Sequence, residues 1–163
     1  MINTIFFLVV AIILCFAWVC FFGAPFVPTR KKWAQEALNL VKLTKDDFVV
    51  DLGSGSGTIL KILSNQRIRS VGYELNPILW VISKIRFIFS NFARVELANF
   101  WKQDLPKQTT VVYVFAVVRD AKKLEKYFTR QSQNSSIKVI TFGFKLPNKN
   151  VIKRTNGAFL YQF

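Results

Sequence analysis

The chain has 163 residues, of which 52% are hydrophobic, and its 23 basic and 9 acidic side chains give a formal net charge of +14. This length is enough for one domain with a sizeable core, and the charge favours a partner such as an anionic membrane surface or a nucleic acid. The absence of histidine, with both cysteines (Cys15 and Cys20) inside an apolar segment, excludes Ser-His and Cys-His catalysis and argues against a metal site.

The first predicted element is an apolar helix over residues 5–22, which contain no charge and no strong helix breaker. A helix of this length spans about 27 Å, close to the roughly 30 Å of a bilayer core. A cleaved signal peptide is the alternative, but no basic residue precedes the run and no A-x-A site follows it. We therefore predict a transmembrane anchor over residues 1–23, a linker over 24–29 and a folded domain over 30–163.

Three basic residues, Arg30, Lys31 and Lys32, follow the linker. By the positive-inside rule, they predict a single-pass membrane protein whose domain lies on the cytoplasmic side, or on the matrix side of a mitochondrial membrane.

Helix-like and strand-like apolar runs alternate from Lys31 onward, which is typical of an α/β domain with a mainly parallel sheet and helices on both faces. The predicted helices cover residues 31–41, 58–65, 76–91 and 120–131. The predicted strands cover residues 48–52, 70–75, 94–97, 109–118 and 137–144. A β-hairpin with an Asn-Gly turn at Asn156 and Gly157 is predicted to end the chain.

Two of these helices have two distinct faces. On the helix from Asp120, basic residues are predicted on one side and apolar residues on the other, as on a solvated helix over a core. On the helix after Pro77, a second apolar stripe (Val81, Ile82, Ile85 and Phe89) lies away from Trp80, Lys84 and Phe87. We expect this second stripe either to lie against lipid or to be buried in a helix covered on two sides.

A glycine-rich turn follows the first strand, in the stretch VVDLGSGSGTIL at residues 49–60. Such a turn lets a ligand approach the backbone, and the N–H groups of the following helix favour an anionic or hydrogen-bonding group. Thr58 stands where the dinucleotide fingerprint needs its third glycine, and no G-K-[ST] follows, so neither a nicotinamide nor a nucleoside triphosphate is favoured. A tight turn that binds nothing is the alternative interpretation.

Glu74 ends the second strand, 23 residues after Asp51. An acidic residue at about this distance can accept two hydrogen bonds from a ribose diol, whereas a surface-facing glutamate at a strand end is the alternative. Because both turns are predicted at the carboxyl ends of neighbouring strands, we expect a nucleoside site there.

These segments resemble a known family. Residues 49–60 resemble motif I of the class I S-adenosylmethionine-dependent methyltransferases. The segment VGYELNPILWVISKIRF (71–87) and FWKQDL (100–105) resemble those of the membrane-anchored protein lysine methyltransferases, whose animal members modify the c-subunit of ATP synthase and the adenine nucleotide carrier. The resemblance covers roughly residues 5–145, and it implies a Rossmann-like class I methyltransferase sheet preceded by one transmembrane helix.

The resemblance also implies S-adenosylmethionine (AdoMet) as the cofactor. Gly53 and Gly55 would line the methionine and ribose parts of AdoMet. Asp51 would order the turn or hold the amino group, and Glu74 would accept hydrogen bonds from the ribose hydroxyls. The full implied cofactor-binding set is Asp51, Gly53, Ser54, Gly55, Gly57, Glu74, Leu75 and Asn76. No catalytic residue is implied, since in-line attack by an amine needs mainly orientation and loss of a proton.

The chain departs from the family in two motifs. Ser54 to Thr58 read S-G-S-G-T where the family usually has S-G-D-G-R, and residues 115–118 read F-A-V-V without the family's proline. We expect cofactor binding to tolerate these changes better than acceptor choice does.

The predicted function is protein-lysine N-methylation of a membrane protein, such as the c-subunit of ATP synthase, with the lipid bilayer as a further partner. An RNA methyltransferase that uses its basic surface and an AdoMet-binding protein without activity are the alternatives. Nucleic acid is the less favoured acceptor, since a membrane tether fits poorly with RNA and no added RNA-binding module is present. The missing N-P-P-[YF] motif and the missing cysteine nucleophile argue against adenine and cytosine methylation.

Overall fold

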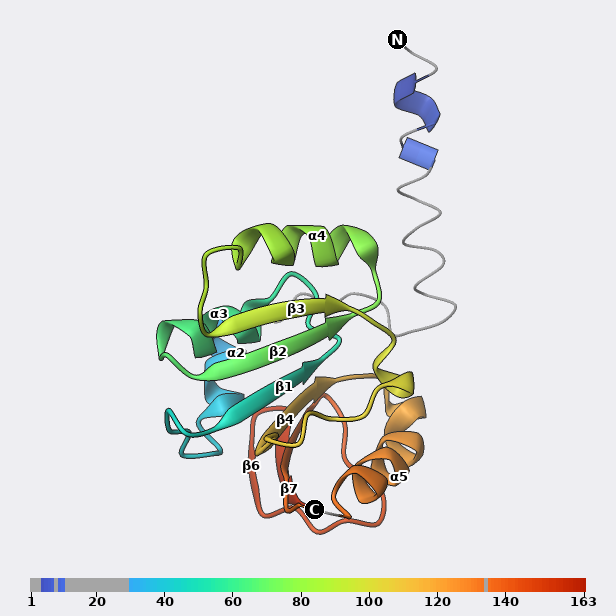
Figure 1. The fold of residues 1–163 in the computed structure, drawn as a ribbon. Helices are drawn as coiled ribbons and strands as arrows, with labels where there is room; N and C mark the ends of the chain where they lie inside the picture. Colours follow the sequence, from blue (N-terminus) through green and yellow to red (C-terminus); the bar gives the residue numbers. More distant parts are fainter. Residues whose placement is uncertain (1–3, 8, 11–29, 134) are drawn as a thin grey trace.

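A computed structural model describes residues 4–7, 9–10, 30–133 and 135–163 (Figure 1). Residues 4–7 and 9–10 are helical. No helix among the described residues is both long and apolar enough to cross a membrane. Most of the predicted anchor, and all of the predicted linker over 24–29, lie outside the described residues.

Residues 48–162 contribute seven strands to one mixed sheet, in the order β3-β2-β1-β4-β5-β7-β6. Their bounds are β1 Phe48–Leu52, β2 Arg69–Glu74, β3 Ala93–Leu97, β4 Val111–Phe115, β5 Lys138–Phe142, β6 Lys153–Thr155 and β7 Ala158–Gln162. Strands β1 to β5 are parallel, while β7 runs antiparallel to both β5 and β6. The mainly parallel sheet and the carboxyl-terminal hairpin are thus confirmed.

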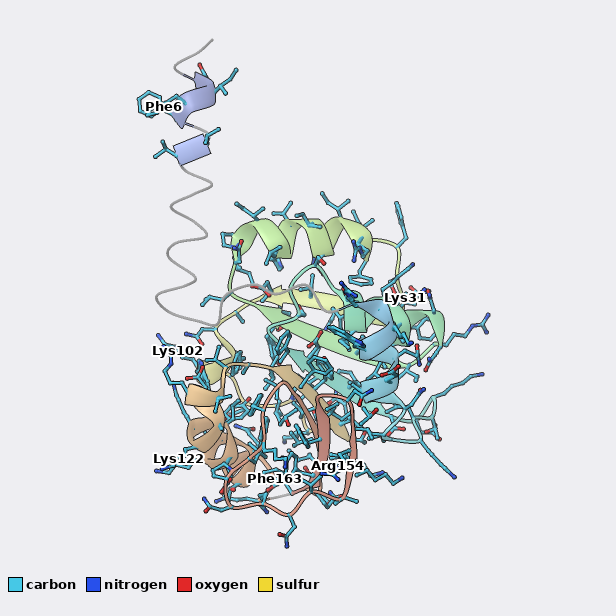
Figure 2. The ribbon with its side chains drawn as sticks, turned by 180° about the vertical axis from the view of Figure 1, so that it is seen from behind. Phe6, Lys31, Lys102, Lys122, Arg154 and Phe163 are labelled. Atoms are coloured by element: carbon cyan, nitrogen blue, oxygen red, sulfur yellow. The ribbon has the colours of Figure 1, made fainter. Side chains whose placement is uncertain are left out.

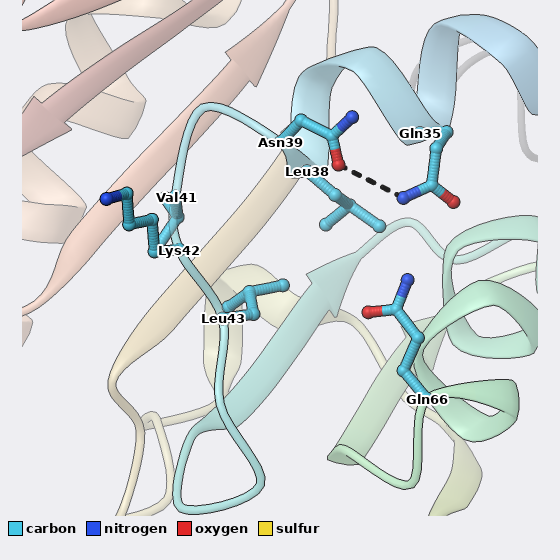
Figure 3. Close-up of a pocket in the computed structure, with 7 residues that line it drawn as sticks. All are labelled: Gln35, Leu38, Asn39, Val41, Lys42, Leu43 and Gln66. Atoms are coloured by element: carbon cyan, nitrogen blue, oxygen red, sulfur yellow. Dashed lines mark hydrogen bonds between the residues drawn. The ribbon is translucent and has the colours of Figure 1, made fainter.

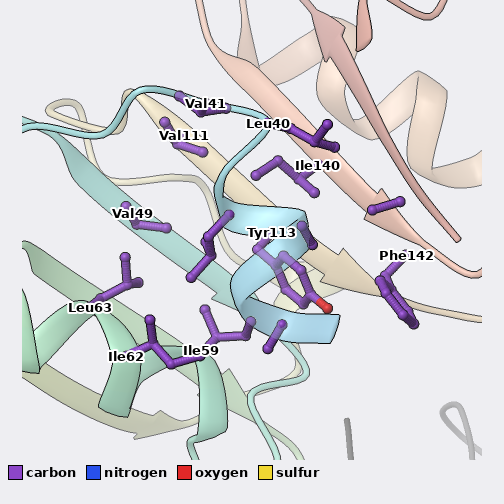
Figure 4. Close-up of a cluster of buried hydrophobic side chains, with 14 of the residues drawn as sticks. Leu40, Val41, Val49, Ile59, Ile62, Leu63, Val111, Tyr113, Ile140 and Phe142 are labelled. Atoms are coloured by element: carbon purple, nitrogen blue, oxygen red, sulfur yellow. The ribbon is translucent and has the colours of Figure 1, made fainter. Parts of the chain in front are cut away.

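The helices cover both faces of the sheet, as predicted (Figure 1). They are α2 Lys31–Leu38, α3 Thr58–Asn65, α4 Pro77–Arg86 and α5 Ala121–Gln131, with short 3₁₀ turns η1 Phe100–Lys102 and η2 Val118–Asp120. On one face, α2 and α3 pack on a core that includes Val49, Tyr113 and Ile140 (Figure 4). On the other face, α5 buries Leu124 and Phe128 against the sheet, which leaves its basic side in solvent.

The start of α4 follows local sequence rules. Asn76 caps the helix, since its Oδ1 accepts hydrogen bonds from the N–H groups of Ile78 and Leu79 at 2.9 and 3.3 Å. Pro77 takes the first helical position, where its missing N–H costs no hydrogen bond. The predicted cap and helix start are therefore confirmed.

Several predicted elements were too long at their carboxyl ends. The helices α2 and α4 end at Leu38 and Arg86, and the strands β4 and β5 end at Phe115 and Phe142. The apolar residues just beyond the two helices, such as Val41 and Phe87, lie in turns and are nevertheless buried. Because a residue in a turn can also be buried, the apolar pattern continues past the ends of the helices, and the predicted helices were too long.

Candidate functional site

The glycine turn leaves the carboxyl end of β1 and opens α3. Gly53, Gly55 and Gly57 have φ values of +81°, +56° and +83°, a region that residues with a Cβ rarely adopt. The N–H groups of Gly53 and Ser54 donate to the Tyr73 carbonyl at 2.9 and 3.0 Å, which fastens the turn to β2. The alternating glycines are therefore required by the path of the chain.

Glu74 lies against this turn, with its side chain buried. Its Oε2 accepts a hydrogen bond from Gly55 N–H at 2.6 Å, and its Oε1 accepts one from Asn76 N–H at 2.7 Å. Burial raises the pKa of Glu74, while backbone N–H groups of Asn76, Gly55 and Leu75 partly oppose that rise. The structure thus brings together the turn and the end of β2, and the alternative of a surface-facing glutamate is excluded.

Asp51, in the middle of the sheet on β1, is a second buried carboxyl group near the turn. Burial, and secondly the charge of Glu74, raise its pKa from 3.8 to about 8. In the ligand-free protein, Asp51 is therefore largely protonated at neutral pH, and a cationic amino group nearby would favour its ionised form.

We expect the ligand-free protein to lose stability as the pH rises from about 4 to about 8. Over that range the unfolded state has released the Asp51 proton and the folded state still holds it, so each rise in pH favours unfolding. Chemical unfolding followed by tryptophan fluorescence measures this dependence. Asp51→Asn should reduce the pH dependence of the free energy of unfolding, and the control Asp46→Asn, at an exposed position, should not. Equal pH dependence in the wild type and both variants would refute the raised pKa of Asp51.

Helix α4 and the residue after it contact the glycine turn. The Arg86 guanidinium Nη1 donates to the Ser56 carbonyl at 2.7 Å. A Cβ built on Gly57 would lie 2.5 Å from Phe87 Cε2 and 2.7 Å from Ser83 Oγ, so the turn rests directly on these side chains. The sequence pattern did not indicate these supports, because the residues lie about 30 positions apart along the chain.

The end of β4 adds an aromatic cluster next to the turn. Leu52, the residue before Gly53, pairs with Val114 in the sheet, and Phe115, the residue after Val114, pairs with Phe142 of β5. The rings of Phe115 and Phe142 lie 5.3 Å apart, and Trp33 of α2 stacks on Phe142 at 6.4 Å. We name Trp33, Phe115 and Phe142 the aromatic cluster; of the three, the sequence had pointed only to Phe115.

A separate hollow of about 270 Å³ lies between the end of α2 and the end of α3, near the amino ends of the strands (Figure 3). It is lined by Gln35, Leu38, Asn39, Val41, Lys42, Leu43 and Gln66. It includes none of the predicted site residues. Among the described residues, no group of three or more His, Cys, Asp or Glu side chains could hold a metal ion.

No protein-family model matches the chain, but curated relatives do. The ATP synthase c-subunit lysine N-methyltransferase of Xenopus laevis is 30% identical over 129 residues, which cover 76% of this chain and 55% of that protein. A protein-lysine N-methyltransferase of Saccharolobus islandicus is 27% identical over 147 residues, covering 82% of this chain and 86% of its own. The chain is thus similar in sequence to proteins named as protein-lysine N-methyltransferases. This confirms the resemblance seen in the motifs, although the chain spans about half the length of the Xenopus enzyme.

Solved structures establish the fold of this chain. An RNA methyltransferase from Salinibacter ruber, solved with S-adenosyl-L-homocysteine, superposes with a TM-score of 0.75 at 22% identity and covers 84% of this chain and 92% of its own. The 23S rRNA methyltransferase ErmE superposes with a TM-score of 0.58 at 18% identity, over 72% of this chain and 48% of its own. The predicted Rossmann-like class I methyltransferase fold is confirmed for the described domain.

Three observations indicate that the site in this chain fits AdoMet. A Cβ built on Gly53 would meet no atom within 4 Å, so space is open above the turn. Ser54 Oγ is buried and has no hydrogen-bond partner within the described part of the chain. The two Glu74 oxygens each accept a backbone hydrogen bond, which leaves each a further lone pair for a hydroxyl.

Proposed function

We propose that this chain is an AdoMet-dependent methyltransferase that modifies a lysine of a membrane protein. The observation that supports this most strongly is the buried Glu74 carboxylate held against the glycine turn, in the class I fold of a chain related to lysine methyltransferases.

The residues of the turn and of β2 would hold the cofactor, which supplies an electrophilic methyl group on a sulfonium when bound. The Glu74 carboxylate would accept hydrogen bonds from the two ribose hydroxyls, and the open space over Gly53 would receive the methionine part. Ionised Asp51 either orders the turn or attracts the amino group of the ligand. Ser54, Gly55, Gly57, Leu75 and Asn76 complete the proposed site.

The aromatic cluster is our proposed entry for the acceptor lysine. A lysine must lose its proton before its amine can attack, and apolar surroundings lower the pKa of an amine. The face of Trp33 already attracts a cation, since the Arg30 guanidinium lies 5.3 Å from its ring centroid. A lysine guided past Trp33 towards Phe115 would be oriented at the turn, and orientation can supply about 7–11 kcal/mol of the barrier.

The membrane setting is part of the same proposal. Residues 1–23 would anchor the chain in the bilayer, with the domain on the cytoplasmic or matrix side. A linker of six residues reaches at most roughly 20 Å, so the site would meet chiefly lysines near the membrane surface. The name of the Xenopus relative supports the c-subunit of ATP synthase as one such acceptor.

Transfer of labelled methyl groups tests this function. The purified full chain receives labelled AdoMet and is offered, in separate reactions, acceptor membranes, total RNA and no acceptor. We expect label in membrane protein, recovered as methyl-lysine after hydrolysis. Label found only in RNA would support the basic-surface alternative, and AdoMet binding without any transfer would support a protein without activity; either result refutes the proposal.

Positive charge alone does not favour RNA over a membrane, because it is spread around the domain. In Figure 2, Lys31 lies on one side of the molecule, and Lys102 and Lys122 lie on the opposite side. A phosphate backbone needs a continuous track of cations, whereas a field of one sign steers any anionic surface.

A further inference from the structure

The outer face of α4 and of the turn after it is apolar and exposed. We name it the α4 face; its residues are Val81, Ile82, Ile85, Ile88 and Phe89. Val81, Ile82 and Ile85, at i, i+1 and i+4, share the outer side of the helix, and Ile88 and Phe89 follow in the turn after it. The exposed fraction reaches 67% at Ile85 and 95% at Phe89. Leu79, Ser83 and Phe87 on the inner side are buried, so the alternative of a helix covered on two sides is wrong for the described chain.

The charges along this segment are all positive. Residues 76–95 contain Lys84, Arg86 and Arg94 but no aspartate or glutamate. Lys84 and Arg86 are exposed beside the α4 face. An apolar stripe bordered by cations is the pattern of a helix that lies in the interface of an anionic bilayer, where apolar burial and attraction to lipid headgroups act together.

Two other candidates that could cover the α4 face, the amino-terminal segment and a second copy of the chain, fit less well. The described residues of the amino-terminal segment do not cover the α4 face, because Ile5, Phe6 and Phe7 are themselves mostly exposed. A second copy docked face to face would bring Lys84 and Arg86 of both chains together, which places like charges opposite each other.

We propose that the α4 face docks on the surface of an anionic lipid bilayer and sets the orientation of the domain there. Ile85 and Phe89 enter the boundary between headgroups and acyl chains, while the Lys84 ammonium group stays at the headgroups. This goes beyond the proposed anchor, because a tether limits distance but leaves the domain free to rotate.

Docking of this face would also fix the glycine turn relative to the membrane. Arg86 bonds to the Ser56 carbonyl, and Phe87 and Ser83 pack beneath Gly57. Since α4 and the turn form one packed unit, a docked α4 presents the site in a constant orientation to lysines at the bilayer surface.

A fluorescence experiment on the full chain tests this orientation. Cys15→Ser and Cys20→Ser remove the native thiols, and Ile85→Cys carries an environment-sensitive label. Ile152→Cys, also exposed and located just before β6, is the matched control. Both proteins are reconstituted into phosphatidylcholine vesicles, with or without phosphatidylglycerol, that contain brominated lipid as a quencher.

We expect roughly threefold stronger quenching at position 85 than at 152 in vesicles with phosphatidylglycerol, because only the α4 face enters the lipid. Lys84→Glu should reduce the quenching at position 85. Equal quenching at both positions, or none at 85, would overturn the proposal. Shielding of the label that depends on protein density and not on brominated lipid would assign the face to a second copy, which also overturns it. No acceptor or AdoMet is present, so failure here leaves the methyl-transfer proposal standing.

Discussion

Glu74→Ala should weaken AdoMet binding by about 100-fold or more while the domain stays folded. Two ribose hydroxyls that donate to a carboxylate are each worth about 1.5–3 kcal/mol, and about 1.4 kcal/mol corresponds to a factor of ten. The substitution also frees Gly55 N–H and Asn76 N–H, which the carboxylate now holds at 2.6 and 2.7 Å. The turn therefore loses its ligand contact and one of its links to β2, while the bonds from Gly53 and Ser54 to Tyr73 remain.

Calorimetric titration measures this loss, and circular dichroism checks the fold. Glu96→Ala is the matched control, since Glu96 lies on the neighbouring strand and its carboxylate forms an exposed ion pair with Arg94 at 3.2 Å. Its affinity for AdoMet should be unchanged. If Glu74→Ala binds AdoMet as tightly as the wild type does, the cofactor does not use this carboxylate and the proposed site is wrong.

Gly72→Val should both destabilise the domain and impair the site. A Cβ at position 72 would lie 2.5 Å from both Ser54 Cβ and Ser54 Oγ and 2.8 Å from Leu60 Cδ1. Overpacking of this kind typically costs about 1–3 kcal/mol of unfolding free energy. Because Ser54 belongs to the glycine turn, relief of the clash displaces the turn from β2, and AdoMet affinity falls as well.

Denaturant unfolding and AdoMet titration on the same preparations test this pair of effects. Ser70→Val adds a β-branched side chain two residues earlier on the same face of β2, and it should keep its AdoMet affinity. The interpretation fails if Gly72→Val keeps the affinity of the wild type, or if Ser70→Val loses as much.

Much of the fold could be predicted from the sequence, because local signals were strong. The run Phe48–Leu52 is apolar except for Asp51 and lies between the pair Asp46-Asp47 and a glycine turn, and β1 has these bounds. The Asn156-Gly157 turn correctly predicted the terminal hairpin. Helix ends were less predictable. Phe87, for example, fits the helical pattern in sequence, but it lies in the turn that follows α4 and is buried there.

The site could be predicted only where it depends on residues close together in sequence or at a fixed spacing along neighbouring strands. The glycine turn and Glu74 follow from spacing along two neighbouring strands. The aromatic contact between Trp33 and Phe142 and the bond from Arg86 to Ser56 join residues far apart in sequence, and no local pattern reports such contacts. Likewise, the sequence identified the stripe of Val81, Ile82, Ile85 and Phe89, but only the packing of the described residues shows that this stripe is exposed and not covered.

A crystal structure of the chain with S-adenosyl-L-homocysteine would decide whether Glu74 and the glycine turn hold the cofactor. We expect one ligand at the carboxyl ends of β1 and β2, with its ribose hydroxyls on the Glu74 carboxylate and its amino acid part over Gly53. A ligand in the hollow between α2 and α3, or in any place that leaves Glu74 and the glycine turn without contact, would show that the proposed cofactor site is wrong.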